Sequence, residues 1–331
     1  MRRYILPENG TFYKANLHCH STCSDGTLTP EQIKEIYKAN GYSVLAYSDH
    51  NVLIDHSDLD DEDFLTITSC EINYNKNSNE NPKLDPCFHI NAFAEDQHND
   101  VLPFYNPKYY FGKSPELKTT QKYLGTPDYV RVYENTNEMI KLFNDNGFFV
   151  TLNHPTWSLQ NLDDLRDVEG AWAMEIYNNS CYHALGYEEQ NEHLFHNLLR
   201  MGKNIFCTAT DDNHNHRNDS CGGFVMIKAP SLTYKNIITA LKNGDFYASN
   251  GPQINELYIE DGMLHIKTSP VHRISVSGIG RQVCFVMPEG IDETVTEASI
   301  KIDGMLPEFI RVTVTDTHGK QAWTQPIYNI K

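Results

Sequence analysis

Short apolar runs recur along the first 215 residues, and each is bounded by a histidine or an acid. Runs of four to eight apolar residues between turn signals are typical of buried strands. The runs with their polar ends are YKANLHCH, YSVLAYSDH, FLTITSCE, FHINAFA, FFVTLNHP and NIFCTATDDNH. If these strands share one sheet or barrel, their polar ends converge on one rim, where α/β folds place ligands and catalytic groups.

Segments with helical character separate these runs. Thr29 before Pro30 has the form of an N-cap with proline in the first turn, and Gly41 stands where that helix should stop. Further helices are predicted at 134–147, 187–202 and 231–244, the last with Ser231 as a cap. Strands that alternate with helices favour a parallel sheet or barrel with outer helices.

Two regions break this rhythm. Residues 72–130 contain a polar stretch and a segment rich in Tyr, Pro and Lys, and we interpret them as an insertion and a candidate lid. Residues 252–331 contain short β runs separated by turns, which predicts a small all-β, sandwich-like domain. The predicted organisation is therefore an α/β sheet or barrel over 1–251 and a β-rich domain over 252–331.

Composition narrows the functional classes. The net charge of −17 disfavours binding of long nucleic acid, which needs clustered Lys and Arg. We find no apolar stretch of membrane-spanning length and no signal-peptide pattern, so no membrane partner is expected. The eight cysteines form no CxxC pair, and several lie in apolar runs, which favours a reduced, cytoplasmic setting. The oligomeric state is left open.

Six histidines and three acids at these strand ends form the strongest chemical signal. Each has an ordinary explanation alone, because HxH pairs arise by chance and Asp-Gly favours turns. Together, imidazole and carboxylate groups meeting at one rim suit a cluster of divalent metals. The nine candidates are His18, His20, Asp25, His50, Glu71, His89, His154, Asp212 and His214.

The motifs HCHSTCSDG, SDHN, NHP and TDDNH, with Glu71 and His89 between them, resemble the PHP family, named for polymerase and histidinol phosphatase domains. They stand in the family's order over about the first 250 residues. The resemblance implies a distorted (β/α)7 barrel with a trinuclear metal centre. A weaker resemblance links 222–254 to the branch that includes carbaryl hydrolases.

The resemblance also implies a ligand set for each ion. His18, His20, Glu71 and Asp212 would hold the first metal, and Glu71, His89 and His154 the second. Asp25, His50 and His214 would hold the third, where Asp25 replaces the histidine of some members and favours Mn²⁺ or Fe²⁺ over Zn²⁺. Asp211 competes with Asp212 as a ligand, and His216 competes with His214.

The expected activity is hydrolysis of a small phosphorylated substrate by a metal-activated hydroxide, with two to three Mn, Fe or Zn ions. His50, Glu71 and Asp212 are the candidate catalytic residues. Arg217 and Arg131 are candidate phosphate contacts, and Glu175 is a substrate-site candidate that could instead orient a ligand histidine. The alternatives are a metal-dependent carbon-ester, carbamate or amide hydrolase and a non-catalytic binding protein.

Overall fold

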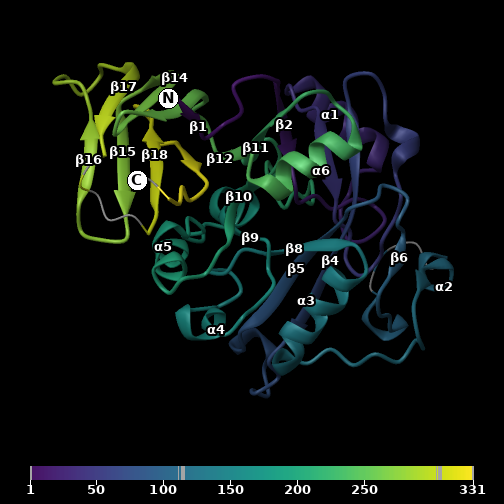
Figure 1. Ribbon diagram of the computed structural model, residues 1–331. Helices are drawn as coiled ribbons and strands as arrows, with labels where there is room; N and C mark the ends of the chain where they lie inside the picture. The colour runs from purple at the N-terminus through teal and green to yellow at the C-terminus, as the bar shows by residue number, and fades with distance from the viewer. Residues whose placement is uncertain (1, 111, 113–115, 303, 305–307, 330–331) are drawn as a thin grey trace.

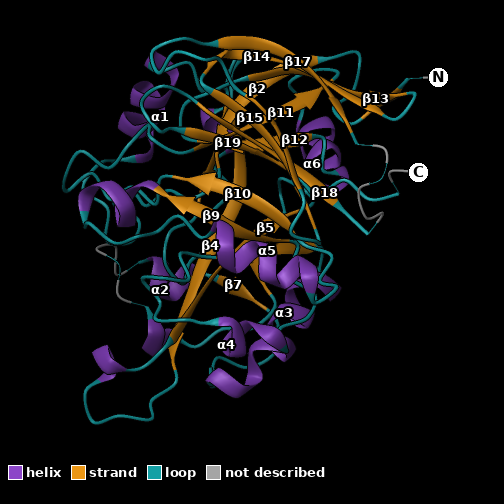
Figure 2. Cartoon of the chain, turned by 90° about the vertical axis from the view of Figure 1, so that its left-hand side faces the viewer, coloured by secondary structure: helices purple, strands orange, loops and turns teal. Residues whose placement is uncertain are grey.

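The computed structural model describes residues 2–110, 112, 116–302, 304 and 308–329. Its main feature is a thirteen-stranded mixed sheet, joined by a four-stranded and a two-stranded sheet and flanked by few helices (Figures 1 and 2). The predicted mixed α/β class is confirmed. In spatial order the large sheet contains β10 (Phe206–Thr210), β9 (Ala173–Asn178), β8 (Phe148–Leu152), β5 (Cys87–Ala94), β4 (Leu65–Asn75), β3 (Val44–Tyr47), β2 (Thr11–Asn16), β11 (Phe224–Ala229), β12 (Phe246–Ser249), β19 (Gln321–Thr324), β18 (Ile310–Thr315), β15 (Arg273–Gly278) and β16 (Val283–Val286).

The seven strands from β10 to β2 hold the apolar runs. β2, β3 and β4 are parallel, as are β8, β9 and β10, whereas β5 runs antiparallel to both of its neighbours. An isolated bridge between Cys19 and Asn213 connects the chain after β2 to the chain after β10. Among the described residues no continuous ladder closes these strands, so a closed (β/α)7 barrel stays a prediction.

Helices lie outside the curved sheet (Figure 2). α1 (Pro30–Ala39) has the predicted cap: Gln32 N–H donates to Thr29 Oγ1, and Thr29 N–H donates to Gln32 Oε1. The other predicted helices are α3 (Thr136–Asp145), α5 (Glu192–Arg200) and α6 (Tyr234–Asn243). Ser231 does not cap α6, because the chain enters that helix at Thr233. Short helical segments are η1 (Ser57–Leu59), η2 (Pro82–Leu84), η3 (Pro107–Tyr109), α2 (Leu117–Thr120), η4 (Tyr133–Asn135), α4 (Leu162–Arg166) and the π-helix η5 (Ser180–Ala184).

Within residues 72–130, β5 is a central strand of the large sheet, and the insertion with its lid stays a prediction. The rest of this region includes the short pair β6 (Val101–Leu102) and β7 (Lys122–Tyr123). Part of the candidate lid, at 111 and 113–115, lies outside the described residues.

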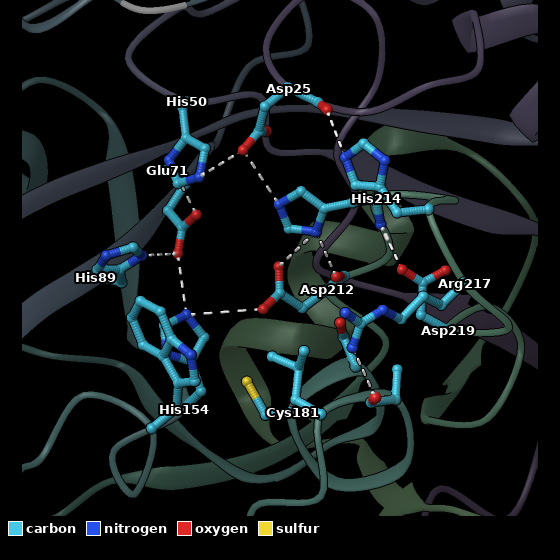
Figure 3. Close-up of a pocket in the computed structure, with 15 residues that line it drawn as sticks. Asp25, His50, Glu71, His89, His154, Cys181, Asp212, His214, Arg217 and Asp219 are labelled. Carbon is cyan, nitrogen blue, oxygen red and sulfur yellow. Dashed lines mark hydrogen bonds and ion pairs between the residues drawn. The ribbon is translucent and has the colours of Figure 1, made fainter.

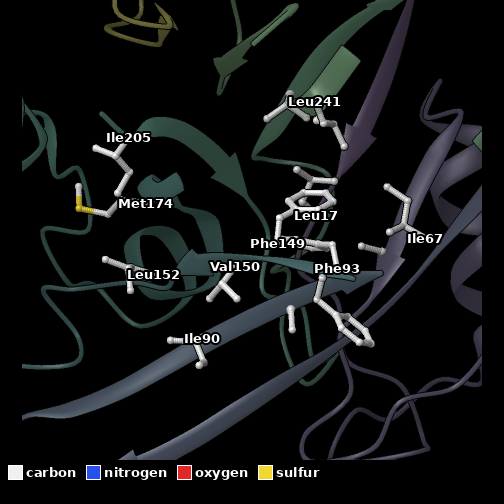
Figure 4. Packing of buried hydrophobic residues seen from close by; sticks show 14 of the residues in the cluster. Leu17, Ile67, Ile90, Phe93, Phe149, Val150, Leu152, Met174, Ile205 and Leu241 are labelled. Atoms are coloured by element: carbon white, nitrogen blue, oxygen red, sulfur yellow. The ribbon is translucent and has the colours of Figure 1, made fainter. Parts of the chain in front are cut away.

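Two main hydrophobic clusters stabilise the molecule. The larger cluster packs the strands against helices α3, α5 and α6, and includes Phe93, Phe149 and Met174 (Figure 4). The second cluster lies between the C-terminal strands of the large sheet and the four-stranded sheet. That sheet contains β1 (Arg3–Tyr4), β13 (Ile254–Glu260), β14 (Met263–Val271) and β17 (Val295–Lys301). In the described part of the chain, no helix is long and apolar enough to span a bilayer.

Candidate metal centre

The nine predicted ligands meet at one rim of the large sheet, where the chain leaves β2, β3, β8 and β10. Figure 3 labels all of them except His18 and His20. His89 lies near the start of β5, and because β5 is antiparallel its start faces the same rim as its neighbours' ends. Glu71 lies inside β4, paired with Asn91. Six imidazoles and three carboxylates are therefore brought together from segments that are up to 196 positions apart in the sequence.

The innermost group contains His18, His20, Glu71 and Asp212, all buried. Their candidate ligand atoms lie within 4.8 Å of one another. Asp212 Oδ1 lies 3.2 Å from His18 Nε2 and 3.1 Å from His20 Nε2, and these two nitrogens are 3.1 Å apart. This is the set that the family resemblance assigns to the first metal.

A second group of His20, Asp25, His50 and His214 also meets within 4.8 Å. Asp25 Oδ2 lies 3.4 Å from His214 Nε2 and 3.9 Å from His50 Nε2. The ring of His20 is stacked on His214 at a centroid separation of 4.2 Å. The predicted third set of Asp25, His50 and His214 is thus adjacent to the first, and His20 belongs to both of the observed groups.

Glu71 links these groups to the remaining two histidines. Its Oε1 lies 3.0 Å from His89 Nδ1 and 3.4 Å from His154 Nε2, and its Oε2 lies 3.2 Å from His50 Nδ1. The two oxygens of one carboxylate thus face different imidazoles, which is the geometry expected of a bridging ligand.

The backbone is unusual at three of these strand ends. His154 has φ 26°, Asp212 has φ 52° and Asn51 has φ 62°. Residues with side chains rarely adopt positive φ, and such conformations cluster at functional sites. At these ends the backbone turn brings the side chains of His154 and Asp212 together. His154 Nε2 lies 3.8 Å from Asp212 Oδ2 and 3.4 Å from Glu71 Oε1.

Glu175 lies behind the cluster, fully buried on β9. Its Oε1 accepts from His18 Nδ1 at 2.7 Å and from Thr210 Oγ1 at 2.6 Å. Its Oε2 accepts from the backbone N–H of His154 at 2.8 Å. The carboxylate is therefore used to orient two candidate ligands, and it does not line the pocket.

Asp211 and Asp212 have different surroundings. Asp211 Oδ1 accepts the N–H groups of Gly222 and Gly223, and its Oδ2 accepts that of Cys221 and the hydroxyl of Tyr37. Burial raises the pKa of Asp211 to about 6 despite these bonds. The geometry thus uses Asp211 to hold the following loop and turns Asp212 toward the histidines.

Neighbouring carboxylates raise the pKa of two candidate ligands, His20 and His89. Burial lowers the pKa of His20, but hydrogen bonds to Asp212 and Glu71 outweigh it and raise the pKa to about 10. His89 behaves alike, since burial lowers its pKa and Glu71 raises it to about 10. Burial opposes ionisation of Glu71, yet the surrounding imidazoles hold its pKa well below its usual range.

A pocket of about 410 Å³ opens over this cluster (Figure 3). Arg217 and His216 are exposed residues of its lining, and Arg217 Nη1 donates to Ala184 O at 3.1 Å. Arg131 is not among the lining residues. It is buried, bonded to Asn51 and the carbonyl of Asn73, and its guanidinium lies 4.4 Å from the Tyr109 ring.

Sequence reasoning missed one wall of the pocket. Trp157 contacts His89 and His154 edge-on at centroid separations of 5.1 and 5.0 Å. The sequence feature that could have indicated Trp157 is its position three residues after the candidate ligand His154. Cys181, Ala184 and Leu185 come from η5 and the residue after it, which no local pattern marked.

No family model matches the chain. A 66-residue segment is 39% identical to a 5'-3' exoribonuclease of Haemophilus influenzae, covering 19% of this chain and 24% of that relative's length. The activity of that relative is therefore not transferable from the match alone.

Solved structures give broader but more distant similarities. A two-domain Bacteroides vulgatus protein, described as containing a predicted PHP-like metal-dependent phosphoesterase, is 16% identical over 98% of both chains, with a TM-score of 0.47. A Bifidobacterium adolescentis protein, for which metal-dependent phosphoesterase activity has been suggested, is 18% identical over 66% of this chain and 92% of its own, with a TM-score of 0.41. A Chromobacterium violaceum amidohydrolase with bound sulfate and no metal is 14% identical over 70% of this chain and 96% of its own, with a TM-score of 0.44. At these identities and TM-scores the activity has to be argued from the chain's own residues.

Proposed function

We propose that the chain is a metal-dependent phosphoesterase that hydrolyses a small phosphorylated substrate. The observation that carries the proposal is the set of nine clustered imidazole and carboxylate side chains, which form overlapping groups of candidate ligand atoms within 4.8 Å. Seven of the nine line one pocket, and His18 and His20 belong to the innermost of these groups. Such nitrogen and oxygen donors suit Mn²⁺, Fe²⁺ or Zn²⁺.

The donor set fits bound metal in a specific way. Glu175 accepts a hydrogen bond from His18 Nδ1, so in neutral His18 the Nε2 atom presents its lone pair to the cluster. That lone pair faces His20 Nε2 at 3.1 Å and an oxygen of Asp212. Acceptor atoms this close repel one another unless a proton or a cation lies between them.

We assign the ligands as the motifs imply. The first ion would be held by His18, His20, Glu71 and Asp212, the second by Glu71, His89 and His154, and the third by Asp25, His50 and His214. When bound, such ions lower the pKa of a coordinated water and neutralise negative charge on a substrate.

The protein's own side chains then orient the substrate. Arg217, held by the Ala184 carbonyl, is placed to pair with a phosphate oxygen. Asp212, Glu71 and His50 fix the geometry at the reacting centre. Trp157 and Leu185 cover one side of the pocket and limit access of bulk water.

A second candidate is hydrolysis of a carbon ester, carbamate or amide. The apolar wall of Trp157, Ala184 and Leu185 favours it, because this wall suits an organic group better than a phosphate. A non-catalytic binding role is the third reading.

The test is turnover by Mn²⁺-reconstituted protein of 4-nitrophenyl phosphate, bis(4-nitrophenyl) phosphate, 4-nitrophenyl acetate and a short oligoribonucleotide. We expect metal-dependent hydrolysis of a phosphate ester, reduced to background in Asp212→Ala. The matched control is Asp163→Ala, which removes an exposed acid that is not among the lining residues of the pocket. Bound metal is counted by mass spectrometry in each variant.

Other outcomes have distinct meanings. Turnover of the acetate alone would replace the phosphoesterase with the carbon-ester hydrolase. Full activity in a metal-counted Asp212→Ala protein would remove this centre from the mechanism. If the protein neither binds metal nor hydrolyses any of the esters, the result would favour the non-catalytic binding role.

A further inference from the structure

A second pocket of about 380 Å³ lies behind one wall of the metal-centre pocket. The wall consists of η5 and the loop at 217–222. Cys181 and Arg217 face the metal centre, whereas the adjacent Tyr182 and Asn218 face the second pocket. Both of these short stretches therefore line both cavities, each through different residues.

The C-terminal strands complete this second pocket through the turn that precedes β19. The turn contributes His318, Gly319 and Lys320 to the lining. It is anchored beside the wall, because Gln321 bonds to Gln190, and Gln321 N–H donates to Asn250 Oδ1 at 2.6 Å. Residues far apart in the sequence thus form one anchored cavity.

The floor of the pocket is closely packed. Asn179 donates from Nδ2 to the carbonyl of Asp219 and accepts from the hydroxyl of Tyr177. A Cβ on Gly222 would lie 2.1 Å from Asn179 Oδ1, so a larger residue there would displace the Asn179 side chain.

The chemistry of the second pocket contrasts with the rest of the chain. The protein has a net charge of −17, yet the described lining residues of this pocket include no aspartate or glutamate. They include Lys320, two histidines and several amides. Among the described residues, the side chains of Lys320 and His183 have no hydrogen bond or ion pair. Asp316, on the same turn, accepts the backbone N–H groups of His318 and Lys320 and does not line the cavity.

We propose that this pocket is a second binding site, for an oxyanion group such as a phosphate or a carboxylate, with Lys320 as its charged partner and the amides as hydrogen-bond donors. The oxyanion belongs either to the distal end of the substrate or to a separate molecule. Binding of the oxyanion does not depend on the reaction at the metal centre, and only the kinetic identification of its source rests on the proposed function.

The primary test locates the anion directly. Crystals of the metal-loaded protein are soaked with selenate, a tetrahedral oxyanion with an anomalous signal. We expect an anomalous peak within hydrogen-bond distance of Lys320 in the wild type and in Lys235→Ala, an exposed lysine of α6 that serves as the control. In Lys320→Ala the peak should be lost, and the solution affinity for selenate at this site should fall about tenfold.

No peak in the second pocket of the wild type would overturn the proposal, whatever selenate does at the metals. A peak that keeps full occupancy in Lys320→Ala would also overturn it. Lys320 is exposed, so its substitution is not expected to unfold the chain.

Kinetic arms then identify the source of the oxyanion. If it is part of the substrate, Lys320→Ala raises KM about tenfold for a substrate with two phosphates and leaves KM for 4-nitrophenyl phosphate unchanged. If it is a separate molecule, selenate changes turnover of 4-nitrophenyl phosphate in the wild type but not in Lys320→Ala.

Discussion

At the scale of single residues, the site depends on carboxylates that fix the position of imidazoles. Glu71 lies within 3.4 Å of five histidines, and Glu175 holds His18 from behind. A histidine that donates through one ring nitrogen presents the other as a free ligand atom, so the outer carboxylate determines which tautomer is available. The two glutamates therefore have different tasks although both are buried.

Removal of the outer carboxylate should weaken metal binding without emptying the site. We expect Glu175→Gln to lower metal affinity by about 10- to 100-fold, because His18 loses a charged acceptor. Chelator competition measures the affinity, and circular dichroism checks the fold. Glu188→Gln, on the exposed chain after η5, is the control. An affinity equal to that of the wild type would show that Glu175 does not orient His18.

Metal binding should also release protons. In the metal-free protein the pKa values of His20 and His89 are raised to about 10, so both rings are protonated at pH 7. Burial lowers the pKa of His18 as well, but Asp212 and Glu71 outweigh burial and raise it. A ligand imidazole must be neutral, so loading displaces at least two protons and apparent affinity rises between pH 6 and 9. Calorimetry in buffers of different ionisation enthalpy measures the release. A heat of binding that is independent of the buffer would contradict it.

At the scale of elements, the direction of strand β5 and the N-cap of helix α1 help to position the segments that carry the candidate ligands. β5 is antiparallel, which brings its first residues, including His89, to the rim formed by the other strands' ends. α1 begins at a capping box and connects the HCH segment to β3. Local capping thus supports the geometry of the rim from outside the site.

The two N-cap threonines offer a matched test of this support. Thr29 accepts a hydrogen bond from its helix, whereas Thr233 makes no side-chain cap bond. We expect Thr29→Ala to lower the free energy of unfolding by about 1 kcal/mol and Thr233→Ala by clearly less. Urea denaturation of both variants measures the difference. Equal losses would mean that the Thr29 bond adds nothing to stability.

At the scale of the whole molecule, the C-terminal strands are joined to the metal-binding half of the chain. β19 pairs with β12, and Trp323 is buried in the larger cluster. Arg311 on β18 is 1% exposed and donates to Glu192 of α5 at 2.6 Å. The division at residue 251 therefore crosses a continuous sheet, and independent folding of the two halves stays a prediction.

The ion pair between α5 and β18 should be costly to break from one side. We expect Glu192→Ala to lower the free energy of unfolding by about 3 kcal/mol, because it leaves the buried Arg311 guanidinium without its carboxylate. Thermal and urea denaturation measure the loss, with Glu188→Ala as the control. A loss below that of an ordinary surface substitution would show that Arg311 finds another partner.

The sequence by itself determined the features that depend on residues close together along the chain. Period-two and period-3.6 patterns located most strands and the main helices, because side chains three or four positions apart share a helix face. Thr29 and Pro30 marked the start of α1. The polar strand ends indicated candidate ligands, since carboxyl ends of parallel strands meet at one rim.

Only the tertiary structure decided features that depend on distant partners. Arg131 looked like a phosphate contact but is buried against Asn51 and Tyr109. The helix predicted from residue 187 begins at Glu192, because Glu189 accepts N–H groups from Thr156 and Trp157 and Gln190 bridges to Tyr177. The direction of β5, the contact of Glu175 with His18 and the pocket beside Lys320 likewise join residues too far apart for any local pattern to encode.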